Sequence, residues 1–513
     1  MYSTGSDDLI SDERMTDCMA RARRGTTRRT PPASPGTGVD RPVAERLREI
    51  RDWIDRGGDT DPAALAERLE DAESVLRQAA AWGLGHLQVH SSRQALERAL
   101  QDPEAAVRSL AAGALGALGH RRSRPALERA LTDPSAQVRE RAAWALWAVA
   151  DRRSEPALLA RLDDEVPGVR WSAAVALGRV GGPGAIAPLT LARGDANDRV
   201  RREALLALAH LNPPDVGRLL RPFLADPAVR VRIAAAVGLG ERKDGAAVPL
   251  LLERLRVEPD VRVLPAVLVA LGRIGDKAAV PVLLGFVSHP TSWARVCAFH
   301  ALTDLGAPEA AAPAREHLAD PIWSVRGAAA ECLGEVGASE DRDRLLALLA
   351  DPEMWPRRGA VYALGRLGLA DTASQIRERL ADPDPEVRLA AVWALGRFGD
   401  LESREALLTL LRDPAATVDG PATFAQGDGA VMLQSDAKDR MFDAVVQALA
   451  RLHQRYPDRS IARALTAARR RLPAKELSRP ARLPAPEIRG GRIGPTLGDL
   501  FPRDPPAPSE NRP

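Results

Sequence analysis

Tryptophan and arginine are the residue types whose placement in this sequence could support binding. The chain has 9 tryptophans among 513 residues, and seven of them recur at related places in a repeating pattern. These seven are Trp82, Trp144, Trp171, Trp293, Trp323, Trp355 and Trp393. An indole ring offers a large flat surface for stacking, and a guanidinium group pairs with carboxylates, phosphates or ring faces. Such residues favour recognition of a partner over bond-making chemistry.

No residues stand in a spacing typical of a catalytic or metal site. The motifs HExxH, G-x-S-x-G, CxxC and the phosphate-binding P-loop are absent from the sequence. The 8 histidines are scattered, and Cys18, Cys297 and Cys332 lack the spacing of a metal site or a disulfide framework. We therefore predict no catalytic residue, no metal ligand and no cofactor.

Composition favours a cytoplasmic protein. The formal net charge is only +3, so the overall field gives no argument for nucleic acid or a membrane surface. Residues 1–30 carry charges throughout and lack an apolar stretch of signal-peptide length. The sequence also has no run of about 18 apolar residues, which a transmembrane helix would need. We expect no membrane partner.

A unit of 31 residues repeats through most of the chain. Asp-Pro pairs mark its start most clearly, for example at Asp102-Pro103 and Asp382-Pro383. Eleven starts follow at intervals of 31, with one interval of 32 before Glu258: Asp71, Asp102, Asp133, Asp164, Asp195, Asp226, Glu258, His289, Asp320, Asp351 and Asp382. If each start is position 0, Leu occupies position +13 in all eleven units and Arg occupies +6 in ten. A fixed period of this length is the signature of stacked supersecondary units.

Each unit predicts a pair of helices. The acidic residue and Pro suit a helix start, and apolar residues at +5, +9, +12 and +13 share one helical stripe. A glycine at +17 suits a left-handed exit from the helix, as at Gly119, Gly275, Gly306, Gly337, Gly368 and Gly399. A second amphipathic segment then closes the unit. Because one pair cannot bury its apolar face alone, we predict an all-α fold: an α-α superhelix, or solenoid, of about 12 two-helix repeats.

One unit departs from the pattern. An extra residue precedes Glu258, Leu264 replaces the usual Arg, and Pro265 stands where a helix interior is expected. Proline removes a backbone hydrogen bond and crowds the preceding turn. We predict a kinked or late-starting helix and a change of superhelical curvature near residues 255–266.

The unit resembles the phycobilin-lyase class of HEAT-like repeats, with the pattern D-P-x-x-x-V-R-x-x-A-x-x-A-L-G-x-x-G. The segments 133–146 and 382–396 match it closely, and the resemblance covers roughly residues 60–413. It implies a HEAT-like solenoid, an architecture that hosts many functions. In such families the paired acid and arginine resemble a ladder that links adjacent units, which we expect of Asp102, Arg108, Asp133, Arg139, Asp164, Arg170, Asp195, Arg201, Asp226, Arg232, Asp320, Arg326, Asp351, Arg357, Asp382 and Arg388.

The tryptophans collect on the face that the repeat leaves free. Positions +4, +7, +11 and +15 of the first helix share a stripe opposite the buried one, with +3 at its border. In HEAT-like solenoids the corresponding helix lines the concave face. We therefore predict a concave groove that binds a protein, either an extended peptide or a folded domain. It is formed by the seven tryptophans together with Arg199, Arg202, Arg230, Arg262, His300, Glu331 and Tyr362.

Three alternatives stay open. Tryptophan at +11 could instead fill space between units. A phycobilin-lyase-like protein, which handles a tetrapyrrole on a carrier protein, would use the same rings and charges, and it is the enzyme class that the resemblance allows. Nucleic-acid binding would use the groove and the basic tails, such as residues 21–29. A di-iron hydroxylase of the deoxyhypusine type is disfavoured, because its tandem His-Glu pairs are absent.

The pattern also predicts where the repeats begin and end. We expect a disordered tail at 1–40, an N-terminal helical cap at 41–70 and tandem repeats at 71–413. A loop insert at 414–436, which is either a passive loop or a lid, precedes a C-terminal helical cap at 437–472 and a disordered tail at 473–513 that is rich in Pro and Arg. The predicted function is a non-catalytic scaffold or adaptor.

Overall fold

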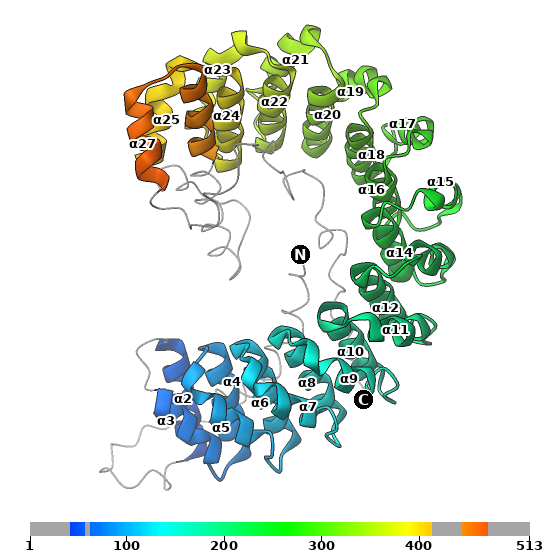
Figure 1. Cartoon of the computed structure of the whole chain (residues 1–513), viewed down its shortest axis with the longest axis vertical. Coiled ribbons are helices and arrows are strands. Elements are labelled where there is room, and N and C mark those ends of the chain that lie inside the picture. The colour runs from blue at the N-terminus through cyan, green and yellow to red at the C-terminus, as the bar shows by residue number, and fades with distance from the viewer. Residues whose placement is uncertain (1–41, 57–61, 413–443, 470–513) are drawn as a thin grey trace, which may run out of the picture. The chain divides into compact units, whose positions relative to one another are not determined.

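The structure is a computed structural model that describes residues 42–56, 62–412 and 444–469. All regular elements within these ranges are helical (Figure 1). The chain forms two compact units, one up to Arg242 and the other from Lys243. None of the described helices is both long and apolar enough to cross a membrane. The predicted tails at 1–40 and 473–513 and the insert at 414–436 lie outside the described residues.

The first unit alternates long and short helices after two leading helices. The leading helices are α2 (Val43–Arg56) and α3 (Pro62–Glu67). The long helices are α4 (Ser74–His86), α6 (Ala105–Leu118), α8 (Ala136–Val149), α10 (Pro167–Val180), α12 (Asp198–Leu211) and α14 (Val229–Glu241). The short helices are α5 (Arg93–Ala99), α7 (Arg124–Ala130), α9 (Glu155–Leu159), α11 (Ile186–Ala192) and α13 (Val216–Leu220). Consecutive long helices pack on one another, and each short helix packs mainly on the long helix of the next repeat.

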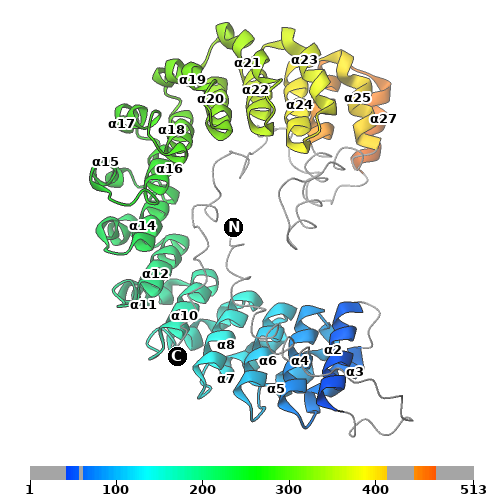
Figure 2. The ribbon, with the colours of Figure 1, turned by 180° about the vertical axis from the view of Figure 1, so that it is seen from behind.

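The second unit continues the same alternation. Its long helices are α16 (Leu264–Ile274), α18 (Ser292–Leu305), α20 (Trp323–Val336), α22 (Met354–Leu367), α24 (Pro385–Phe398) and a helix over residues 444–455. The remaining helices are α15 (Val248–Val257), α17 (Val280–Phe286), α19 (Ala311–His317), α21 (Arg342–Leu348), α23 (Ala373–Glu378), α25 (Arg404–Arg412) and α27 (Arg459–Arg469). In each unit taken by itself, the long helices form the inner row and the short helices the outer row (Figures 1 and 2). The predicted all-α solenoid of two-helix repeats is confirmed.

The long helices begin in register with the sequence repeat. They start at position +3 in every repeat except the one that begins at Glu258. In that repeat α16 begins only at Leu264, with Pro265 in its first turn. A proline is tolerated there because the first amides of a helix have no intrahelical acceptor. The late-starting helix is therefore confirmed, whereas the change of curvature stays a prediction.

Two repeated positions hold the helices together. The leucine at +13 is fully buried in every repeat. Burial of one leucine side chain contributes about 2 kcal/mol to the free energy of folding. A glycine at +14 lies against an alanine of the next long helix. A Cβ atom on Gly116 would stand 2.8 Å from the Cα of Ala145, and one on Gly334 would stand 2.9 Å from that of Ala363. Glycine therefore lets successive long helices approach backbone to backbone.

The exits of the long helices follow the glycine expectation with one exception. Gly119, Gly275, Gly306, Gly368 and Gly399 all have positive φ. Gly337 instead has φ −78° and ψ −173°, so it leaves the helix in an extended conformation. Ala150 and Asn212 take the left-handed conformation at the same position in other units, with φ of 52° and 50°. Gly181 stands at the same position and is extended, with φ −66° and ψ 156°, so the position favours the left-handed exit but neither requires it nor requires a glycine.

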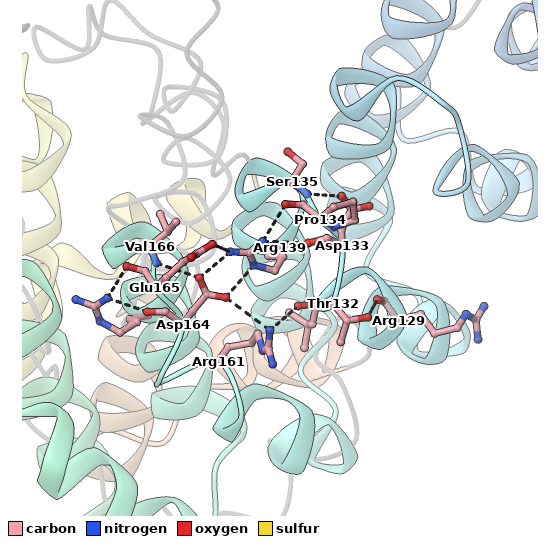
Figure 3. Close-up of polar contacts among 12 residues, drawn as sticks. Arg129, Thr132, Asp133, Pro134, Ser135, Arg139, Arg161, Asp164, Glu165 and Val166 are labelled. Atoms are coloured by element: carbon pink, nitrogen blue, oxygen red, sulfur yellow. Dashed lines mark hydrogen bonds and ion pairs between the residues drawn. The ribbon is translucent and has the colours of Figure 1, made fainter.

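Arg–Asp pairs form a ladder that links each 31-residue repeat to the next (Figure 3). Arg139 donates through Nε and Nη2 to the two carboxylate oxygens of Asp164, both at 2.8 Å. Its Nη1 donates to the carbonyl oxygens of Asp133 and Pro134 at 3.0 and 3.2 Å. Each such Arg–Asp pair therefore links the turn at the start of one repeat to the aspartate that begins the next repeat. The partner acid lies 25 residues after the arginine, at the start of the following repeat.

The ladder acids do not cap the long helices in the expected way. Asp164 accepts the backbone amide of Val166 at 3.1 Å, and Val166 is the residue before α10 begins. The acid thus closes a turn ahead of the helix. The further rungs are Arg77–Asp102, Arg108–Asp133, Arg170–Asp195, Arg201–Asp226, Arg295–Asp320, Arg326–Asp351 and Arg357–Asp382. Arg46 of α2 donates through Nη1 to both carboxylate oxygens of Asp71, at 3.0 and 2.8 Å, a rung that the repeat pattern did not include.

Candidate functional site

The long-helix face is the set of side chains at +3, +4, +7, +11 and +15 on the inner row of helices. The predicted groove residues lie on this row, except Arg262. Because α16 starts late, Arg262 stands in the turn before it, where it binds Asp260 at 2.7 Å. The remaining candidates form separate clusters in the two units.

In the first unit, three indoles form a continuous stack. The ring centroids of Trp144 and Trp147 are 4.9 Å apart, and those of Trp144 and Trp171 are 6.2 Å apart, with nearly parallel planes. The guanidinium of Arg179 lies 4.7 Å from the centre of the Trp147 ring. All three rings are half-buried, so each keeps surface for a partner. Sequence reasoning missed Trp147, because its position, +14, is usually a glycine.

Glu203, which is buried, and Glu140, which is half-buried, lie on long helices beside this stack. Burial raises the pKa of Glu203, although Arg202 and a hydrogen bond with Trp171 act in the opposite direction. Burial likewise raises the pKa of Glu140, against the effect of nearby arginines. The pairing of Trp171 with Glu203 fixes the indole in its plane.

The other candidates of the first unit do not join the stack of rings. Trp82 stacks on His86 within α4, with ring centroids 4.8 Å apart. On the following long helices, Arg230 binds Asp198 at 3.2 Å. Arg199 and Arg202 stand half-exposed or exposed on α12. The structure therefore does not gather these residues into one pocket.

In the second unit, Trp323 and Trp355 form a stacked pair. Their ring centroids are 6.0 Å apart, with an interplanar angle of 8°. The guanidinium of Arg358 lies 5.5 Å from the centre of the Trp355 ring. Trp293, on the neighbouring helix α18, is 45% exposed, which is high for a tryptophan. These rings offer the second unit's apolar contact surface.

Position +11 of four successive helices carries His300, Glu331, Tyr362 and Trp393. The nearest nitrogen of His300 lies 3.9 Å from a carboxylate oxygen of Glu331. Burial raises the pKa of Glu331 to about 7, with Arg358 acting against it. His300 and Glu331 are each 7% exposed, and Trp393 is 8% exposed. These three side chains therefore offer a partner little surface.

A polar network borders that row. Tyr362 donates to Oε1 of Glu335 at 2.9 Å, and Arg366 binds the other oxygen of the same carboxylate. Burial, with Glu335 nearby, raises the pKa of the Tyr362 hydroxyl. Tyr362 also stacks on Trp393 at 5.1 Å between ring centroids. The arrangement orders the aromatic rings of this row.

Metal-binding and thiol chemistry have no assembled site in the part of the chain that the structure describes. No group of three His, Cys, Asp or Glu side chains converges there in a way that could hold a metal ion. Cys297 and Cys332 are fully buried, and burial raises the pKa of each thiol to about 12. Both thiols stay protonated at neutral pH.

Known proteins match this chain in both sequence pattern and fold. HEAT repeats match residues 62–146, 128–209, 189–267, 258–334, 288–364 and 343–425. Kap95 in its complex with Nup1 is 14% identical, with a TM-score of 0.60 over 84% of this chain and 73% of that chain. Yeast importin-β (Kap95p) is 13% identical, with a TM-score of 0.56 over 84% of this chain and 77% of that chain. The CpcE–CpcF complex of phycocyanin lyase from Nostoc sp. PCC7120 is 25% identical over 53% of this chain and 92% of that chain, with a TM-score of 0.26. No curated protein sequence matches.

Proposed function

Because this chain belongs to the HEAT repeat family, we propose that it is a scaffold that binds another protein through its long-helix face. Repeat solenoids present extended surfaces, and side chains outside the repeat consensus determine what those surfaces bind. In this chain those side chains are indoles and arginines. Kap95, which shares the fold, was solved in a complex with the protein Nup1, a precedent for protein binding by this architecture.

The two indole clusters are the observation that carries the proposal. Trp144, Trp147 and Trp171 in the first unit, and Trp323 and Trp355 in the second, are stacked yet half-exposed. Tryptophan is strongly enriched among the residues that dominate protein–protein binding energy. Neighbouring stacked rings are also rigid, so little side-chain entropy is lost when a partner covers them.

The charges beside the rings define the partner further. Arg179 and Arg358 lie over the indole faces, while Glu140 and Glu335 stand near the same rows. Mixed charge of this kind sets the register and selectivity of a protein interface. We infer a partner segment that carries apolar or aromatic side chains and charges of both signs.

Affinity capture from an extract of the source organism tests the proposal. Wild type is compared with the Trp144→Ala/Trp171→Ala and Trp323→Ala/Trp355→Ala variants, and retained proteins are identified by mass spectrometry. The matched control is Leu191→Ala/Leu250→Ala, which removes exposed apolar side chains (80% and 45% exposed) from short helices. We expect the same partner to be lost from both Trp variants and kept by the control, with helicity unchanged by circular dichroism.

Two other results would redirect the assignment. A coloured complex formed on mixing with a bilin, and lost in the Trp variants, would favour chromophore handling. Salt-sensitive retention on DNA that survives in the Trp variants would favour nucleic-acid binding. A partner retained equally by all variants would exclude the indole clusters as the binding surface.

A further inference from the structure

Glu140 is a carboxylate of the first indole cluster that has no partner among the described residues. It stands half-buried at position +7 of α8. No described residue donates a hydrogen bond to it or forms an ion pair with it. By contrast, Glu203 bonds with Trp171 in the same cluster. In the second unit, Glu335 accepts a hydrogen bond from Tyr362. Within the described chain, Glu140 therefore keeps both carboxylate oxygens as free acceptors.

The carboxylate of Glu140 lies against the first turn of α10. A Cβ atom added to Gly168 would stand 2.7 Å from Oε2 of Glu140 and 3.2 Å from its Cδ. A larger residue at this position would push the carboxylate away. Glu140 precedes Trp144 by four residues on α8, and Gly168 precedes Trp171 by three on α10. Both spacings place side chains on one helical face, so the carboxylate is held beside the two stacked indoles.

Indole rings of this chain already bind guanidinium groups. Arg179 stands 4.7 Å from the centre of the Trp147 ring, and Arg358 stands 5.5 Å from that of Trp355. The negative face of an aromatic ring attracts a cation, and a planar guanidinium also packs flat against it. A carboxylate with free oxygens beside such rings adds two acceptors for the N–H edge of the same group. One guanidinium can therefore use both features together.

Two arginines near Glu140 affect how a cation would bind there. Burial raises the pKa of Glu140, and the charges of Arg141 and Arg199 act in the opposite direction. Neither arginine forms an ion pair with it. Arg141 lies against α6 instead, where a Cβ atom added to Gly113 would stand 3.2 Å from its Cδ. A bound cation must contact the carboxylate directly to outweigh their repulsion, so removal of the Arg141 charge should strengthen its binding.

We propose that Glu140, Trp144 and Trp171 bind an arginine side chain of the partner protein, with its guanidinium paired to the carboxylate and lying against an indole. The contact belongs to the long-helix face, so it rests on the protein-binding function proposed above. Arginine fits better than lysine, because a planar guanidinium pairs with two oxygens and packs on a ring, whereas an ammonium is a compact point charge.

Fluorine NMR of the full chain tests this site with a defined probe. All 9 tryptophans are replaced by 5-fluorotryptophan, and two signals are assigned with Trp144→Phe and Trp171→Phe. Nα-acetylarginine amide is titrated at constant ionic strength, with Nα-acetylcitrulline amide as a neutral probe of the same shape. We expect the arginine probe to shift the signal of Trp144 or Trp171, and the citrulline probe to leave both in place.

Four variants separate Glu140 from other causes of a shift. Glu140→Gln should weaken binding of the arginine probe about tenfold or more, because the charge-assisted hydrogen bonds are lost. Gly168→Ala should weaken it too, since the added Cβ displaces the carboxylate. Arg141→Gln should strengthen it by removing a repulsive charge. Asp163→Asn is the matched control, because Asp163 is exposed in the turn after α9 and its loss changes the net charge as Glu140→Gln does.

Three results would overturn the assignment: no shift at either indole, an equal response to the citrulline probe or to Nα-acetyllysine amide, or a response that Glu140→Gln leaves intact. The protein-binding proposal fails separately, when wild type and the Trp variants capture the same partner equally. Capture that depends on the indoles, together with an arginine response that does not depend on Glu140, would reject the arginine contact and keep the scaffold function.

Discussion

At the residue scale, the chain separates arginines that hold the fold from side chains that are free to recognise a partner. Spacing alone marked the ladder residues, because an Arg at +6 recurs with an acid at each repeat start. The exact partner was not readable from the pattern, since the acid of the same unit and that of the next unit are equally regular. The repeat did not identify Trp147, because tryptophan does not recur at its position. Nor could the sequence predict the burial of Glu331, because that burial depends on neighbouring side chains from three helices.

The ladder predicts a large stability difference between two arginines of the first unit. Arg139 and Asp164 are 7% and 9% exposed, so Arg139→Ala leaves a buried carboxylate without its two-bond partner, with only Arg161 remaining at 3.6 Å. We expect a loss of about 3–5 kcal/mol in the free energy of unfolding. Arg98 pairs with Glu70 across 3.5 Å with both side chains mostly exposed, so Arg98→Ala should cost about 1 kcal/mol or less. Urea denaturation measures both, and equal losses would contradict the role of the ladder.

Glu331 predicts a stability that depends on pH. Its folded pKa of about 7 lies above the ordinary value of 4.5, so the folded state binds the proton more tightly than the unfolded state does. This contribution favours folding below about pH 4.5 and is lost as pH rises to about 7. Glu331→Gln keeps the shape without the charge. We expect it to stabilise the protein by up to about 3 kcal/mol at pH 8 and by clearly less at pH 5.

Thermal melts of wild type and Glu331→Gln at the two pH values measure this difference. Glu335→Gln serves as the control, because Glu335 is half-buried and already bound by Tyr362 and Arg366. A Glu331→Gln variant that melts below wild type at pH 8 would show that the carboxylate is stabilised in its ionised form.

At the element scale, the period of the sequence was enough to place almost every long helix. The repeat predicts their starts because position +13 must face the core in each unit. It did not predict the extended exit at Gly337, where glycine could adopt either conformation. Nor did it show that α16 begins late enough to leave Arg262 in a turn, although Pro265 pointed to that outcome.

The close approach of the long helices predicts opposite effects for one substitution at two sites. Alanine is the better helix former by about 1 kcal/mol, which favours Gly→Ala where space allows. Gly285 of α17 has nothing within 4 Å of an added Cβ, so Gly285→Ala should be neutral or stabilising. An added Cβ on Gly334 would lie 2.9 Å from the Cα of Ala363, so we expect Gly334→Ala to cost about 1–3 kcal/mol. Thermal denaturation of the two variants checks the sign of each effect.

At the scale of the whole molecule, the repeats form two compact units divided between α14 and α15, inside the repeat that begins at Asp226. The division falls inside the one repeat of 32 residues, between Asp226 and Glu258, so the extra residue of the sequence period lies in the repeat where the two units meet in sequence. The indole clusters lie well inside each unit: one on α8 and α10, the other on α20 and α22. Each cluster is built by successive helices of one unit.

The most direct test of the account places a photo-crosslinking amino acid at Trp171 or Trp355 on the long-helix face, and at Leu191 or Leu250 on short helices. Irradiation in cell extract is followed by mass spectrometry of the crosslinked peptides. The account predicts that one partner protein crosslinks at both tryptophan positions and at neither leucine position. Crosslinks that form only at the leucine positions would contradict it.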